Sequence, residues 1–297
     1  MAAEAGSEPK RVRDWLNATV VRFKRSGLHF GHGSSNARDE AVYLLLHTLH
    51  LPLDELDAVL DRPLNGDELR ELERIVHRRV DERIPAAYLT QEAWLGEYKF
   101  FVDERTIVPR SYIAELLLDG LHPWVGDVHT ISSALDLCTG SGCLAILLAL
   151  VFPNACVDAT DLSADALSVA QRNIDEYELG NRVHLARGDL FADLTGRYDL
   201  IIANPPYVDQ NAMARLPAEY RAEPAMALAG GQDGLDIVRR MLAVAPRYLN
   251  ERGLLIMEIG HNREALERSF PRLPFTWLET SGGDGLVFLL SAEELAL

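Results

Sequence analysis

The stretch Tyr198–Tyr207, with the sequence YDLIIANPPY, decides the fold. Its apolar residues Leu200–Ala203 predict a buried strand of the kind found in parallel sheets that are covered on both faces. Pro205 and Pro206 end this strand, because neither proline has an N–H group for the next ladder bond. Asn204 is then left at the carboxyl end of the strand, which is the edge where open α/β sheets bind ligands.

This strand end also predicts a chemistry. An amide nitrogen is a poor nucleophile because its lone pair is delocalised into the carbonyl group. The side-chain oxygen of Asn204 and the carbonyl oxygen of Pro205 can accept both hydrogens of a substrate NH2 group and hold its nitrogen towards an electrophile. Tyr207 is expected to pack against the cofactor or the substrate. The alternative is a plain proline-terminated strand with an Asn turn, and this stretch alone does not separate the two.

Strands and helices alternate on both sides of this stretch, which predicts a mainly parallel, doubly wound Rossmann-like sheet. Near the C-terminus two short apolar runs flank a glycine-rich turn, so the sheet is expected to be mixed at one edge. The expected strands are 134–138, 155–160, 182–186, 198–203 and 253–259, followed by 275–279 and 286–290, and the expected helices lie near 142–151, 163–176, 235–248 and 263–270.

The rest of the chain divides into three further segments. Residues 1–11 are small and polar and are expected to be disordered. Residues 12–90 show helical periodicity and predict a small helical bundle domain, our candidate for substrate docking, whose third helix is expected to end at Pro85. Residues 91–108 predict a β-hairpin connector. The α/β domain then covers residues 109–297.

Composition restricts the class of partner. The 297 residues are 48% hydrophobic and 25% charged, with a formal net charge of −16, which argues against direct DNA binding and favours a basic partner. The three cysteines, Cys138, Cys143 and Cys156, indicate a reduced, cytoplasmic protein. No membrane span is expected, because the longest apolar run contains Asp136 and two glycines. His29 and His32 lack a third ligand and are assigned to an interhelix turn, so no metal site is predicted.

A glycine-rich loop joins the first strand of the α/β domain to a helix. It spans Asp136–Cys143 and has the sequence DLCTGSGC. Glycines let the backbone approach a ligand closely, and the helix N-terminus presents free N–H groups. The loop also fits G-x-G-x-x-A, with Asp161 located 21 residues after Gly140, so an NAD-dependent dehydrogenase is a serious alternative. Asp136 argues for a cationic ammonium or sulfonium group rather than a pyrophosphate.

Carboxylates follow three successive strands and form the strongest functional signal. Asp136 ends the first strand, Asp161 ends the second, and Asp189 follows the third. Asp161 can accept both hydroxyls of a ribose, and Asp189 can accept from an adenine amino group. Since the carboxyl ends of parallel strands share one edge, these carboxylates and Asn204 are expected to lie together.

These motifs resemble the HemK/PrmB family of class I S-adenosylmethionine-dependent methyltransferases. Asp-x-x-x-Gly-x-Gly with a strand-end Asp is typical of the class, and Asn-Pro-Pro-Tyr is typical of enzymes that methylate amide or exocyclic amino nitrogens. The resemblance extends from about residue 12 to the C-terminus. Tyr112 stands where the subgroup usually has proline, and residues 91–97 depart from its pattern. Further matching stretches are Phe30–Gly33, Val108–Ser111, Glu219–Pro224, Gly234–Arg240 and Pro274–Glu279.

The resemblance implies transfer of a methyl group from S-adenosyl-L-methionine to a glutamine side-chain amide of ribosomal protein uL3, either free or in an assembling large ribosomal subunit. It implies three sets of residues. The catalytic set is Asn204, Pro205 and Tyr207. The cofactor-binding set is Asp136, Cys138, Thr139, Gly140, Ser141, Gly142, Asp161, Leu162, Asp189, Leu190 and Asn204. The substrate-binding set is Asn204, Pro205, Pro206, Tyr207 and Arg110.

Other functions remain open besides the dehydrogenase. A release-factor glutamine is an alternative substrate within the same family. An adenine-specific DNA methyltransferase shares Asn-Pro-Pro-Tyr, but the acidic composition disfavours it. A non-catalytic assembly factor would bind its ribosomal protein without needing Asn204.

Overall fold

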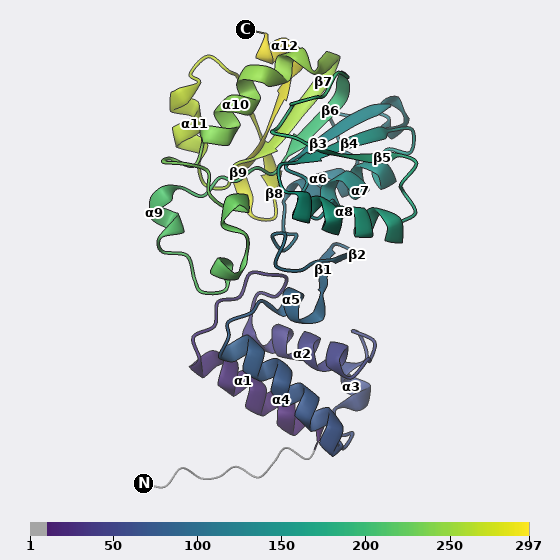
Figure 1. Ribbon diagram of the computed structural model, residues 1–297, viewed down its shortest axis with the longest axis vertical. Coiled ribbons are helices and arrows are strands. Elements are labelled where there is room, and N and C mark those ends of the chain that lie inside the picture. Colours follow the sequence, from purple (N-terminus) through teal and green to yellow (C-terminus); the bar gives the residue numbers. More distant parts are fainter. Residues whose placement is uncertain (1–10, 297) are drawn as a thin grey trace. The chain divides into compact units, whose positions relative to one another are not determined.

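The computed structural model describes residues 11–296 as two compact units, drawn in Figure 1. The helical unit comprises the described residues up to Glu92 together with Pro217–Ala222. The sheet unit comprises Ala93–Leu216 and the described residues from Glu223 onward. The sequence instead predicts Pro217–Ala222 within the α/β domain and residues 91–108 as a connector.

Amphipathic helices form the helical unit around one apolar core. Trp15, Phe23 and Leu72 are fully buried there. Asn36 and Asn65 cap two of the helices, each accepting hydrogen bonds from two backbone N–H groups of the first turn. The helices are α1 (Val12–Arg25), α2 (Ala37–Thr48), α3 (Leu56–Val59), α4 (Gly66–Val80), α5 (Ala86–Thr90) and the 3-10 turn η2 (Tyr220–Ala222).

The end of α4 differs from its prediction. Helix α4 ends at Val80 rather than at Pro85, because Asp81 closes its last turn and Arg83 adopts a left-handed conformation (φ 59°). Pro85 instead precedes α5 as its N-cap residue. The disorder predicted for residues 1–11 falls, except at Arg11, outside the described residues.

A buried charge cluster holds Pro217–Ala222 in the helical unit. The Arg79 guanidinium donates to Glu40 (2.6 Å), to Glu219 (3.2 Å) and to the His29 carbonyl (2.9 Å). Arg79, Glu40 and Glu219 are each at most 2% exposed. Burial raises the pKa of Glu40 above its usual value. Burial acts in the same direction on Glu219, but hydrogen bonds from backbone N–H groups and Arg79 outweigh it and lower the pKa of Glu219.

The sheet unit contains a seven-stranded sheet with the order β5-β4-β3-β6-β7-β9-β8. The first five strands in this order are parallel, whereas β9 is antiparallel to both β7 and β8. Its strands are β3 (Ser133–Leu137), β4 (Cys156–Asp161), β5 (Val183–Arg187), β6 (Tyr198–Ala203), β7 (Leu249–Glu258), β8 (Thr276–Thr280) and β9 (Gly283–Ser291), and a separate two-stranded sheet pairs β1 (Glu92–Leu95) with β2 (Tyr98–Phe101).

Helices cover both faces of this sheet (Figure 1), and its central strands β3 and β6 are accordingly mostly apolar and buried. One core contains α6 and α7, and the other contains α10 and α11. No helix within residues 11–296 combines the length and apolarity needed to cross a bilayer. The helices of the sheet unit are α6 (Ile113–Leu118), α7 (Cys143–Val151), α8 (Ala164–Glu176), α9 (Gln210–Met213), α10 (Asp236–Val244), α11 (Arg263–Ser269) and α12 (Ala292–Leu295), with 3-10 turns η1 (Val128–Thr130), η3 (Ala225–Ala227) and η4 (Ala245–Arg247).

The predicted mixed, mainly parallel Rossmann-like sheet is confirmed, with differences at element ends. Strand β7 begins at Leu249 rather than at residue 253, because polar residues 250–252 continue it beyond the apolar core. Helix α10 ends at Val244, where the 3-10 turn η4 with its proline follows. The chain moves from β5 across to β6 on the other side of β3, so a switch point of the topology lies between β3 and β6.

Candidate active site at the carboxyl ends of the parallel strands

A cavity opens at the switch point, beside the carboxyl ends of β3, β4 and β6, and encloses about 800 Å³ of empty space, part of it open to solvent. Its lining comes from the loops after these strands and after β5, and from two segments distant in sequence. The lining residues are Arg105, Thr106, Ile107, Cys138, Gly140, Thr160, Asp161, Leu162, Ser163, Ala166, Gly188, Asp189, Leu190, Asn204, Pro206, Pro224, Met226, Ala227 and Ile237.

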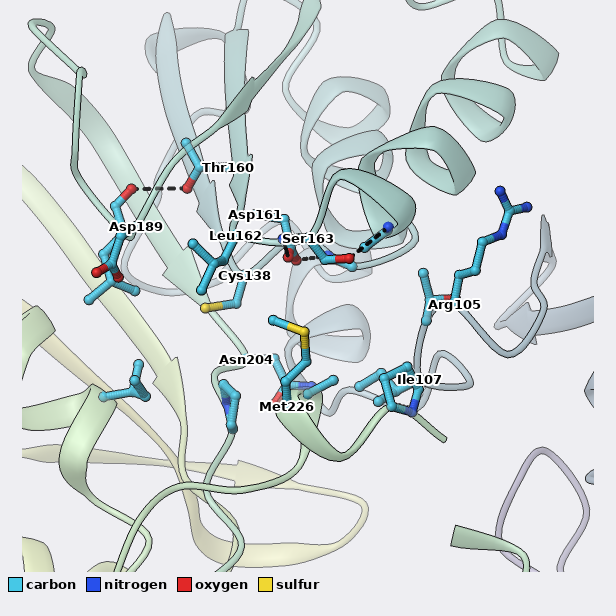
Figure 2. A pocket seen from close by; sticks show the side chains of 18 of the residues that line it. Arg105, Ile107, Cys138, Thr160, Asp161, Leu162, Ser163, Asp189, Asn204 and Met226 are labelled. Carbon is cyan, nitrogen blue, oxygen red and sulfur yellow. Dashed lines mark hydrogen bonds between the residues drawn. The ribbon is translucent and has the colours of Figure 1, made fainter. Parts of the chain in front are cut away.

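The cavity lining contains two carboxylates, Asp161 and Asp189, and one cation, Arg105. Figure 2 shows Cys138 and Asp161 between Asp189 on one side and Arg105 and Ile107 on the other. Asp103 forms a bidentate ion pair with Arg105. Asp189 is likewise paired with Arg240, so Asp161 is the lining carboxylate that has no ion pair among the described residues. An unpaired carboxylate suits a ligand that offers cationic or hydrogen-bond donor groups better than one with a pyrophosphate.

The glycine-rich loop after β3 owes its shape to a few backbone features. Gly140 has a positive φ of 55°, and nothing lies within 4 Å of the position that a Cβ would take, so its backbone is open to a ligand. Gly142 serves packing instead, because a Cβ there would approach the Cβ of Ala170 in α8 to 3.0 Å. Asn173, also in α8, donates a hydrogen bond of 2.8 Å to the Ser141 carbonyl and so fixes the loop to this helix.

Two non-glycine residues at this edge adopt left-handed backbone conformations. Cys138 has φ 60° and Leu190 has φ 59°, and both line the cavity. Such conformations are unfavourable for residues with a Cβ and cluster at functional sites. Burial raises the pKa of the Cys138 thiol, so this cysteine is a neutral lining group rather than a nucleophile.

Asp136 lies beneath the loop with one unsatisfied oxygen. Its Oδ2 accepts a hydrogen bond of 2.6 Å from Thr139, whereas its buried Oδ1 has no hydrogen-bond partner among the described residues. Burial, together with the nearby Asp161 carboxylate and despite the bond from Thr139, raises the pKa of Asp136 to about 7. An unpartnered carboxylate oxygen of this kind fits a cationic donor such as an ammonium group.

Backbone hydrogen bonds orient the Asp161 carboxylate in the cavity lining. It accepts backbone N–H bonds of 2.9 Å from Gly140 and from Ser163, which orient the carboxylate at the end of β4. Burial raises its pKa, while these N–H donors act in the opposite direction. Each carboxylate oxygen retains a lone pair, so Asp161 can accept from a vicinal diol.

Asp189 lies at the far side of the cavity and pairs with a cation. Its Oδ2 accepts a hydrogen bond of 2.7 Å from Arg240, and both side chains are about half exposed. An exposed pair of this kind contributes little stability, so it does not prevent Asp189 from accepting a ligand donor.

Asn204 lines the cavity at the end of β6, as predicted from the sequence. Within the described part of the chain, neither its side-chain oxygen nor the Pro205 carbonyl oxygen receives a hydrogen bond. Asn204 therefore presents a free acceptor to the cavity, whereas Pro205 is buried outside the lining, so the role of its carbonyl oxygen stays a prediction. Tyr207 is not part of the lining, and its hydroxyl group donates to Glu258 (3.1 Å).

The structure brings most, but not all, of the predicted site residues to the cavity. Those in its lining are Cys138, Gly140, Asp161, Leu162, Asp189, Leu190, Asn204 and Pro206, and those outside it are Asp136, Thr139, Ser141, Gly142, Pro205, Tyr207 and Arg110. Arg110 makes a bidentate ion pair with the buried carboxylate of Glu223. A role of Arg110 in substrate binding stays a prediction.

Sequence reasoning missed two lining segments, Arg105–Ile107 and Pro224–Ala227. Both lie beside stretches that match the family, Val108–Ser111 and Glu219–Pro224. Their position next to these stretches is the signal in the sequence that could have identified them. The pairing of Arg110 with Glu223 joins the same two stretches.

Comparison with known proteins agrees with this geometry. The family model "Methyltransferase small domain" matches residues 114–220, and "PrmC N-terminal domain" matches residues 14–90. The fold resembles that of the hMettl16 catalytic domain, with a TM-score of 0.50 and 16% identity over 78% of this chain and 84% of that chain.

Curated relatives are much more similar. The ribosomal protein uL3 glutamine methyltransferase of Neisseria gonorrhoeae is 56% identical over 99% of both chains. The protein of the same name from Burkholderia pseudomallei is 58% identical over 96% of both chains. At this level of identity and coverage, the chain belongs to the family of ribosomal protein uL3 glutamine methyltransferases.

Proposed function

We propose that this protein transfers the methyl group of S-adenosyl-L-methionine to the side-chain amide nitrogen of a glutamine in ribosomal protein uL3. The observation that carries the proposal is the position of Asn204. Its oxygen and that of Pro205 lie at a strand end without hydrogen-bond partners among the described residues, next to a cavity lined by carboxylates.

We assign each of three carboxylates to one part of the cofactor. Asp136 is our candidate partner for its ammonium group, Asp161 for its ribose hydroxyls and Asp189 for its adenine amino group. Bound S-adenosyl-L-methionine supplies a methyl group on a positively charged sulfur, which makes the methyl carbon electrophilic. The dehydrogenase alternative has no support from the curated relatives.

Asn204 and Pro205 prepare the nucleophile. By accepting its two N–H groups they hold the glutamine amide with its nitrogen lone pair directed at the methyl carbon, which converts an encounter into a positioned reaction. The same oxygens stabilise the positive charge that develops on nitrogen. Once the methyl group has moved, the nitrogen is acidic and releases its proton without a strong base.

The proposed partner is uL3, free or within an assembling large subunit. The sheet unit carries 15 basic and 28 acidic residues, whereas the described residues of the helical unit carry 13 and 15, so the acidity lies mainly on the unit that holds the site. This charge fits a basic ribosomal protein. We assign substrate docking to the helical unit. A cytoplasmic location fits such a substrate and the free thiols of Cys138, Cys143 and Cys156.

The test is methyl transfer from labelled cofactor to purified uL3, with the modified residue located by mass spectrometry. We expect one glutamine of uL3 to gain a single methyl group and a release factor under the same conditions to gain none. Preferential methylation of the release factor would favour the alternative substrate. Absence of methylation of both proteins, with cofactor bound, would favour a non-catalytic assembly factor.

A further inference from the structure

A fourth carboxylate lies at the same edge of the sheet and takes no part in the chemistry described above. Glu258 ends β7 and is 2% exposed. Its Oε2 accepts from the Ser111 hydroxyl (2.7 Å) and from the Tyr112 N–H (2.9 Å), and its Oε1 accepts from the Tyr207 hydroxyl (3.1 Å). Glu258 therefore joins the start of α6 to the tyrosine of the Asn-Pro-Pro-Tyr stretch.

Tyr207 is fixed at its backbone as well as at its hydroxyl group. The Asn262 side chain donates a hydrogen bond of 2.8 Å to its carbonyl oxygen. Three glycines pack against it so closely that a Cβ on Gly230 would lie 2.8 Å from its Cα, one on Gly234 2.3 Å from its carbonyl oxygen, and one on Gly260 2.7 Å from its ring. Since these approaches leave no room for a side chain, the position of Tyr207 is closely determined.

The side chain of Asn204 is not held by hydrogen bonds in this way. Its side chain makes no hydrogen bond to any residue between 11 and 296, so the chain on either side sets its orientation. On one side β6 is paired with β3 and β7. On the other side Pro205 and Pro206 have restricted φ angles and connect Asn204 rigidly to Tyr207.

The groups around Glu258 match an ionised carboxylate. All three hydrogen-bonding partners are donors, and a carboxylate offers only acceptors. Burial raises the pKa of Glu258, whereas these donors and the nearby Arg110 act to lower it. A glutamine in its place would turn an NH2 group towards at least one of the donors.

We propose that Glu258 is a positioning residue for methyl transfer, which acts through the hydroxyl of Tyr207 to hold Asn204 and Pro205 in the geometry that orients the substrate amide. The proposal rests on the proposed role of Asn204. In this proposal Glu258 fixes Tyr207, and the restricted backbone of Pro205 and Pro206 in turn fixes the position of Asn204.

The chain offers a matched control for this pair. At the other end of β6, the Tyr198 hydroxyl donates to the Asp158 carboxylate (2.7 Å), and Tyr198 is 3% exposed. This is also a tyrosine–carboxylate bond, and its tyrosine belongs to the strand that leads to Asn204, but it lies at the amino end of that strand, away from the cavity. Tyr198→Phe and Asp158→Asn therefore remove the same kind of bond without touching the site.

The experiment compares Tyr207→Phe, Glu258→Gln and the double variant with the parent in kcat, KM for uL3 and cofactor Kd. We expect each single variant to lower kcat by about 10- to 100-fold, the loss typical of small misplacements of reacting groups. KM and Kd should stay within about threefold. The double variant should lose little more than either single variant, because both remove one connection. Tyr198→Phe and Asp158→Asn should keep the parent kcat.

Three outcomes would overturn the proposal. The first is a Tyr207→Phe enzyme with the parent kcat, a result that stands even where Glu258→Gln does not fold. The second is additive losses in the double variant. The third is an equal loss of kcat in the Tyr198 and Asp158 variants, which would mean that only stability of the sheet is involved. Failure of the proposed function is a separate result, because the parent would then not methylate uL3.

Discussion

At the scale of single residues, the proposed chemistry depends most on Asn204. We expect Asn204→Ala to fold and to bind cofactor within a few-fold of the parent, because the side chain ends a strand and fills no core position. Turnover should fall by about 100- to 1,000-fold, which corresponds to roughly 2.7–4 kcal/mol, since one preorganised polar group is lost. Single-turnover methyl transfer at saturating cofactor, with a thermal melt as the folding control, measures this. A variant that turns over like the parent would reduce Asn204 to a strand terminator.

Asp136 predicts a pH dependence of cofactor affinity. Its pKa is raised to about 7, so the carboxyl group is largely protonated below that pH and cannot pair with an ammonium group. We therefore expect affinity to be full above pH 7 and to fall by up to about tenfold per pH unit below it. Titration calorimetry between about pH 5.5 and 8.5 measures the change. Asp136→Asn should bind weakly at every pH, and a parent affinity independent of pH would contradict the assignment.

The raised pKa of Asp136 has the opposite effect on the stability of the cofactor-free protein, which decreases as the pH rises. The unfolded chain releases this proton near the ordinary aspartate pKa of 3.8, whereas the folded protein keeps it up to about 7. The contribution of Asp136 to stability is thus full below about pH 4 and is lost as the pH rises through 7. Bound cofactor, by pairing with the carboxylate, should offset this loss.

At the scale of elements, the apolar strands and the glycine-rich loop were predictable because their patterns are local. A short apolar run such as Leu200–Ala203, bounded by turn residues, is typical of a buried strand. The loop segments Arg105–Ile107 and Pro224–Ala227 were not predictable as lining, because their place depends on the path of the chain and not on their own pattern. Glu258 carried the same signal as Asp136, a carboxylate at the end of an apolar strand, yet its partner Tyr207 could be identified only in three dimensions.

Helix α4 supports a prediction about buried charge. Arg79→Met should destabilise the helical unit by about 3–5 kcal/mol, because it leaves Glu40 and Glu219 buried without their shared guanidinium. Arg74→Met on the same helix breaks an exposed pair with Glu71 and should cost at most about 1 kcal/mol. Amide hydrogen exchange of α1, α2 and α4 measures both. Equal protection in the two variants would show that the buried cluster contributes no more than a surface pair.

At the scale of the whole molecule, the distribution of charge predicts how the substrate arrives. Because the sheet unit has a net charge of −13, association with basic uL3 should be steered electrostatically. We expect the association rate to fall as salt rises beyond physiological strength, where the Debye length is about 8 Å, and the dissociation rate to change less. Stopped-flow binding over a salt series measures both rates. An association rate that does not change with salt would contradict electrostatic steering. The acidic charge would then serve solubility alone.

The assignment of Pro217–Ala222 to the helical unit has a consequence for protein engineering. A gene fusion that moves only the first 92 residues of this protein into another enzyme would transfer Arg79 and Glu40 but leave Glu219 behind. The graft would then depend on whether the host happens to supply a matching acid. A working chimera therefore requires two inserted segments, because the helical unit is built from two separate stretches of the chain.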